Sequence, residues 1–111
     1  MELRKATKQE RKNLWGSSFH NTTIYATVDE LTEIFGQENI GASSDDKTKH
    51  EWYIKDETDN RYFSVYDWKE YRNYPSDEMI EWHIGSKLTS EEEQAFADEL
   101  KKRLSELRQR N

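Results

Sequence analysis

The sequence contains no cysteine, only one proline and four glycines, and no long apolar run. The absence of cysteine excludes a disulfide framework, a thiol nucleophile and a cysteine-ligated zinc site. The apolar runs are far shorter than the roughly 20 residues that a membrane-spanning helix needs. No apolar stretch follows the charges of Met1–Lys5, so we expect no secretory signal. The scarcity of proline and glycine also argues against a flexible linker.

What is abundant is charge and aromatic rings. Charged residues make up 36% of the 111 residues and the mean hydropathy is −1.23, which is typical of disordered chains. Aromatic residues make up 13%, and disordered chains lack them. We therefore expect one folded domain whose core depends on large rings. The net charge of −6 disfavours direct binding to nucleic acid.

The first residues differ in charge from the rest of the chain. Residues 1–13 contain five basic and two acidic side chains, and Thr7 and Glu10 have capping-box spacing. We interpret residues 1–18 as a basic, partly helical N-terminal arm and residues 19–111 as a single α+β domain. The acid-rich stretch 28–60 is interpreted as a solvated face, with mimicry of nucleic-acid charge as the alternative.

Four segments have the alternation or the β-branched composition of strands: residues 22–27, 49–55, 61–68 and 80–84. A helix is expected after Thr27, capped with Glu30 and ended by Gly36. A longer C-terminal helix begins with Ser90 and Glu93, or with Thr89 and Glu92, as its capping box. The prediction is a largely antiparallel four-stranded sheet, with two helices on one face and a short N-terminal helical arm.

The two faces of this sheet have different compositions. Strand alternation predicts that one face is apolar and covered by the helices: Ile24, Ala26, Trp52, Ile54, Phe63, Val65, Ile80, Trp82 and Ile84. The other face carries rings with polar tips, two carboxylates and a histidine: Tyr25, Glu51, Tyr53, Tyr62, Ser64, Tyr66, Glu81 and His83. Such a face can stiffen the sheet through cross-strand pairs, contact a protein partner, or bind a ligand.

The segment 66–74 is the densest in residues that recognise ligands. Aromatic rings stack on bases, and arginine or lysine binds phosphate. We predict a ligand-binding site in which Tyr66, Trp68 and Tyr71 stack, Lys69 and Arg72 bind phosphate, and His83 or His20 contacts a base or ribose. The alternative is that Trp68 closes the end of the core. The scattered histidines and isolated glycines form no metal, phosphate-loop or nucleophile motif, so we expect no cofactor, no metal and no catalysis.

Four strings carry a family resemblance: Phe19–Ile24, Lys47–Trp52, Val65–Tyr71 and Glu81–Gly85. Together they resemble a group of small proteins encoded by tailed bacteriophages, over residues 19–86. The resemblance implies a protein in the cytoplasm of a bacterial host, with no membrane contact. We expect an accessory protein that sequesters a nucleotide-derived immune signal, of the cyclic-nucleotide or ADP-ribose type, as a homo-oligomer. The alternative is an acidic inhibitor of a host defence or nucleic-acid enzyme.

Overall fold

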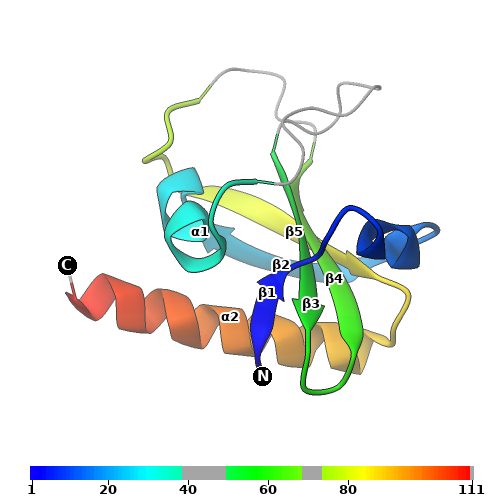
Figure 1. The fold of residues 1–111 in the computed structure, drawn as a ribbon. Helices are drawn as coiled ribbons and strands as arrows, with labels where there is room; N and C mark the ends of the chain where they lie inside the picture. The colour runs from blue at the N-terminus through cyan, green and yellow to red at the C-terminus, as the bar shows by residue number, and fades with distance from the viewer. Residues whose placement is uncertain (39–49, 69–73, 111) are drawn as a thin grey trace.

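Five antiparallel strands form one sheet with two helices on one face (Figure 1). The computed structural model describes residues 1–38, 50–68 and 74–110. The strands lie in the order β1-β3-β4-β5-β2, so β1 and β2 are the two edges. Their bounds are β1 Leu3–Lys5, β2 Ser18–Ala26, β3 Glu51–Asp56, β4 Arg61–Asp67 and β5 Ile80–Ser86.

The two helices, α1 (Val28–Phe35) and α2 (Ser90–Arg110), begin at capping boxes. For α1 the prediction is confirmed, because the Thr27 hydroxyl accepts from the Glu30 amide and the Glu30 carboxylate accepts from the Thr27 amide. For α2 the structure decides between the two predicted boxes. The Glu92 amide donates to the Thr89 hydroxyl and the Thr89 amide to the Glu92 carboxylate. Glu93 is therefore available for another role.

The core lies between the helices and the face of the sheet that the alternation predicted. All nine residues predicted for that face are buried. Phe63 of β4 stacks on Phe96 of α2 with ring centroids 4.2 Å apart. The indole N–H groups of Trp52 and Trp82 donate to the carbonyls of Gly36 and Ala26, each at 2.9 Å. These bonds satisfy the polar ends of the two largest core side chains.

The predictions of four strands and of a helical arm are wrong. The fifth strand, β1, pairs antiparallel with β3 through Leu3, Arg4 and Lys5. A single short 3₁₀ segment, η1 (Glu10–Leu14), follows it. The capping-box contact between Thr7 and Glu10 does form, but the Glu10 carboxylate also binds Arg4 and Lys55 of the sheet. Glu10 thus holds the segment against the sheet, where only one short 3₁₀ turn forms.

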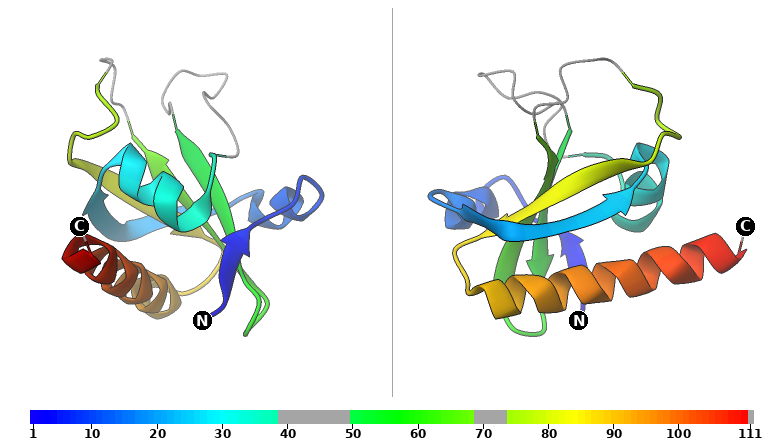
Figure 2. Two further views of the ribbon diagram at one scale, coloured as in Figure 1. Left: turned by 60° about the vertical axis from the view of Figure 1, so that its left-hand side comes forward. Right: turned by 180° about the vertical axis from the view of Figure 1, so that it is seen from behind.

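The chain between β1 and β2 passes over the face of the sheet that the helices leave open. In Figures 1 and 2, η1 lies on the side of the sheet opposite to α1, and it contacts β4. Neither helix in the described part of the chain has the length and apolar character needed to cross a membrane.

Candidate functional site

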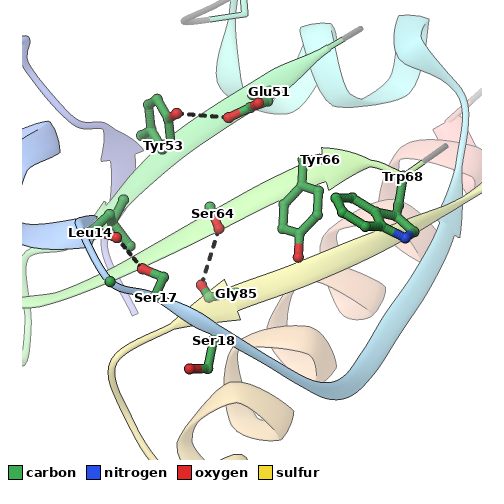
Figure 3. Close-up of a pocket in the computed structure, with 10 residues that line it drawn as sticks. Leu14, Ser17, Ser18, Glu51, Tyr53, Ser64, Tyr66, Trp68 and Gly85 are labelled. Carbon is green, nitrogen blue, oxygen red and sulfur yellow. Dashed lines mark hydrogen bonds between the residues drawn. The ribbon is translucent and has the colours of Figure 1, made fainter. Parts of the chain in front are cut away.

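A pocket of about 330 Å³ lies on the open face, between the sheet and the connection from η1 to β2 (Figure 3). This volume is within the range of small-molecule sites, which begins at roughly 300 Å³. Four of its lining residues come from the strands β3 and β4: Glu51, Tyr53, Ser64 and Tyr66. The others come from the arm, the start of β2, the position after β4, and β5: Leu14, Gly16, Ser17, Ser18, Trp68 and Gly85.

The base of the pocket consists of two cross-strand pairs. In the hairpin of β3 and β4, Glu51 lies opposite Tyr66 and Tyr53 lies opposite Ser64. Alternate residues of a strand share a face, so all four side chains point to the open side. Figure 3 shows them projecting from the two neighbouring strands. The hairpin therefore sets the spacing of the rings and of the carboxylate.

Gly85 of β5 leaves room for the neighbouring side chains. It lies opposite Ser64, whose hydroxyl donates to the Gly85 carbonyl at 3.3 Å. A Cβ atom at this position would lie 2.8 Å from the Ser64 Oγ and 3.4 Å from the Tyr66 Cε1. Since real Cβ atoms do not approach an oxygen so closely, a side chain at residue 85 would displace the Ser64 hydroxyl, whereas it would only touch the ring of Tyr66.

The arm forms one side of the pocket through Leu14, Gly16, Ser17 and Ser18. It is held by Glu10, whose carboxylate accepts two bonds from the Arg4 guanidinium, at 2.8 and 2.9 Å. These bonds hold the pKa of Glu10 far below its usual range. The guanidinium of Arg11 lies over the ring of Tyr53, with its Cζ 5.7 Å from the ring centroid. The arm thus brings one cation to the edge of an aromatic site.

Rings gather at the end of β4. Trp68, 39% exposed, lies edge-on to Tyr66 at 6.2 Å and stacks with His83 at 6.2 Å. His83 stacks on Phe19 of β2 at 4.0 Å. Trp68 therefore lies on the open face, outside the core, and the alternative that it closes the end of the core is wrong.

One carboxylate lies among the described residues that line the pocket. Glu51 is the only charged side chain among the described lining residues, and it accepts a 2.7 Å bond from the hydroxyl of Tyr53. Burial, together with the charges of Glu51 and Glu93, raises the pKa of Tyr66 to about 12. Burial and the bond to Glu51 also raise the pKa of Tyr53. Both phenols therefore keep their protons at neutral pH, and the hydroxyl of Tyr53 donates to Glu51.

The structure brings together some of the predicted site residues. Tyr66 and Trp68 line the pocket, and His83 contacts both rings without lining it. Burial lowers the pKa of His83, so its ring is neutral at pH 7. Lys69, Tyr71 and Arg72 lie outside the described residues.

His20 lies apart from the pocket. Its Nδ1 is 2.6 Å from the carboxylate of Glu93, which is fully buried in the first turn of α2. Ser86 donates to the same carboxylate oxygen at 2.5 Å. The two contacts tie β2 and β5 to α2, so His20 serves this junction.

The contributors to the site that sequence analysis missed include Glu51, Tyr53 and Arg11. Strand alternation placed Glu51 and Tyr53 on the open face, but the predicted site with Tyr66 did not include them. This link could have been predicted from the hairpin. If Asp56 pairs with Arg61 next to the turn, counting along both strands places Glu51 opposite Tyr66. The contribution of Arg11 had no comparable signal, because it depends on how the arm folds back.

Comparison of the chain with protein-family models gives no match, and comparison with curated proteins gives none either. Within residues 1–38, 50–68 and 74–110, no group of three or more histidine, aspartate or glutamate side chains could hold a metal ion.

Proposed function

We propose that the protein binds and sequesters a nucleotide-derived immune signal, of the cyclic-nucleotide or ADP-ribose type, without catalysis. The observation that carries this proposal is the pocket itself, where Tyr53, Tyr66 and Trp68 surround a space of ligand size. In the setting that we propose, a phage accessory protein acts in the cytoplasm of a bacterial host and removes a signal by binding it stoichiometrically.

The lining groups suit a nucleoside. Stacking on an aromatic side chain contributes ~1–3 kcal/mol per base, and it tolerates different bases because each base has a π-face. Tyr66 and Trp68 offer such surfaces, and the serines and phenols offer hydrogen bonds to a ribose. Arg11, over the ring of Tyr53, is a described cation that could bind a phosphate, while phosphate contacts of Lys69 and Arg72 stay a prediction.

The ionisable groups favour binding over turnover. General-base catalysis needs a group that accepts a proton near neutral pH. The two phenols keep their protons at neutral pH, so neither serves as a base there. These properties support a role in which the ligand leaves the site chemically unchanged.

The test is calorimetry with a panel of cyclic dinucleotides, cyclic trinucleotides and ADP-ribose isomers. We expect at least one member to bind, and Trp68→Ala to weaken its binding by about tenfold or more, which is ~1.4 kcal/mol. Tyr25→Ala is the matched control, because Tyr25 is 60% exposed on the same face but outside the pocket. Binding by no member tighter than ~100 μM contradicts the proposal. Recovery of an altered ligand after the complex is heated contradicts the absence of catalysis.

A second observation favours contact with a protein. Trp15, in the arm beside the pocket, is 74% exposed, and exposed aromatic side chains often anchor interfaces. We propose that it contributes to a homo-oligomer, and sedimentation of the wild type and of Trp15→Ser tests this. The alternative function, inhibition of a host defence or nucleic-acid enzyme, predicts instead a stoichiometric protein partner that Trp15→Ser releases.

A further inference from the structure

We propose that Glu51 gives the pocket a preference for guanine, because its carboxylate accepts from two adjacent donors on the edge of that base. This inference rests on the proposed function and names the base that the same site takes. It concerns selectivity among nucleotides, which the aromatic rings alone do not provide.

The geometry begins with the β3–β4 pair. Glu51 and Tyr66 are direct cross-strand partners, so their Cβ atoms lie roughly 4.5–5.5 Å apart. Both side chains line the pocket. A base that stacks on the ring of Tyr66 can therefore turn one edge to the Glu51 carboxylate, while its sugar, attached at the opposite edge, points away from it.

The orientation of the carboxylate is set before a ligand binds. The Tyr53 hydroxyl donates to the Glu51 Oε2 at 2.7 Å and so fixes one oxygen against the β3 strand. An ionised carboxylate offers about four acceptor sites on its two oxygens, so it can accept further bonds while keeping this one. Because burial contributes to the raised pKa of Tyr66 nearby, hydrogen bonds formed there are less weakened by water.

The donors and acceptors on the edge of each base determine which base the carboxylate binds best. A carboxylate accepts and cannot donate, so it matches an edge with neighbouring donors. The N1–H and the N2 amino group of guanine are two such donors, and they can bind both carboxylate oxygens at once. Adenine offers its N6 amino group beside the N1 acceptor, whose lone pair opposes the carboxylate. Hypoxanthine keeps the N1–H but lacks the N2 amino group.

The test is a calorimetric series on the wild-type protein with GMP, IMP, AMP and 2′-deoxy-GMP, and with cyclic di-GMP against cyclic di-AMP. We expect GMP to bind at least about tenfold more tightly than AMP, with IMP between them. We expect 2′-deoxy-GMP to bind within about threefold of GMP, because the carboxylate contacts the base and not the ribose. This series needs no variant, so it is independent of any effect of substitution on folding.

The variant Glu51→Gln is the second part of the test. It removes the charge and one acceptor while keeping the size of the side chain. We expect it to weaken GMP binding by about 10–100-fold and to change AMP binding by less than about threefold. Glu81→Gln is the matched control, since Glu81 also accepts from a tyrosine hydroxyl on the open face, that of Tyr25 at 3.0 Å, but outside the pocket.

The outcomes separate the inference from the proposed function. Equal binding of GMP and AMP, a ligand that contains only adenine, or a preference that survives Glu51→Gln overturns the guanine assignment and leaves a nucleotide site. A large loss with 2′-deoxy-GMP reassigns Glu51 to the ribose and overturns it as well. Failure of every nucleotide in the wider panel removes the proposed function, and the inference with it.

Discussion

Glu93 is the residue that joins the sheet to the long helix. It is fully buried in the first turn of α2, where its carboxylate binds His20 of β2 and Ser86 of β5. The Ser86 hydroxyl also accepts from the Leu88 amide at 3.0 Å, which fixes the turn into α2. A buried carboxylate requires such partners, because an isolated charge in the interior is costly.

The neighbouring glutamates Glu92 and Glu93 give a direct comparison of a cap with a buried junction. We expect Glu93→Ala to lower the free energy of unfolding by about 3 kcal/mol, since it leaves His20 and Ser86 without their shared acceptor. Glu92→Ala removes the capping contacts with Thr89 and an ion pair with Arg61 at the surface, and it should cost only about 0.5–1 kcal/mol. Urea unfolding of both variants measures the difference. Equal losses would contradict the role of Glu93 as a junction.

Residue parity explains which site residues were predictable. Even-numbered residues of β2, such as Ile24, face the helices, and odd-numbered ones, such as Tyr25, face the open side. The pairing of β2 with β5 shifts between Phe19 and Thr23, where Asn21 has a φ of 66°, so this alternation does not extend to Phe19 and His20. The positions of Phe19 beside His83 and of His20 beside Glu93 could therefore not be predicted from it. The partner of His20 could not be predicted, because Glu93 is distant in sequence and equally suited to a cap.

At the scale of elements, the open face depends on the arm. β1 pairs with the outer edge of β3, and the Ala6 amide continues the pairing with a 2.7 Å bond to the Tyr53 carbonyl. The strands that were predicted have alternating or β-branched sequences, whereas β1 has three residues, two of them charged. Such a segment has no sequence signal of its own, and it becomes a strand only because β3 offers an unpaired edge.

The docking of the arm should depend on pH. The pKa of Glu10 is lowered in the folded protein, chiefly by its bonds to Arg4, so the stabilisation is present above the unfolded value of roughly 4.3 and is lost as the pH falls below it. We expect hydrogen exchange at the Ala6 amide to lose its protection as the pH is lowered from about 5 towards 2, after correction for intrinsic rates, before α2 unfolds. Glu10→Gln should show low protection already at pH 6.

Glu57→Gln is the control for this experiment. Glu57 contacts the same Arg4 guanidinium at 3.1 Å but is nearly half exposed. Exposed ion pairs contribute little, so this variant should stay close to the wild type. If the protection of Ala6 is the same in Glu10→Gln and in the wild type across the pH range, Glu10 is not what holds the arm.

For the whole molecule, stability rests on the packing of α2 against the sheet. Phe96 is fully buried and stacks face to face on Phe63. We expect Phe96→Ala to cost about 3–5 kcal/mol, a large part of the roughly 5–15 kcal/mol that stabilises a typical domain. Thermal and urea unfolding measure this loss. Phe19→Ala, at an exposed ring on the open face, should cost about 1 kcal/mol or less, and an equal cost would show that the two faces contribute alike.

The fold class, the two helices and the buried face followed from the sequence because periodicity reports which side of an element is buried. The same alternation placed Tyr66 on the open face, whereas Trp68 was chosen because the segment 66–74 is dense in rings and cations. The pocket was not, because its concavity arises from the crossing of the arm, the gap at Gly85 and the Glu51–Tyr66 register together. Each of these is a relation between segments and not a property of one segment.

The positions of β1 and β2 at opposite edges of the sheet also bear on the order of folding. Pairing β1 with β3 closes a loop of about 50 residues, while β3, β4 and β5 join through nearer neighbours. The sheet and its helices can thus assemble first, with β1 attaching to a finished edge. The pocket would then be completed only in the final kinetic phase, after the sheet and both helices had reached their native packing.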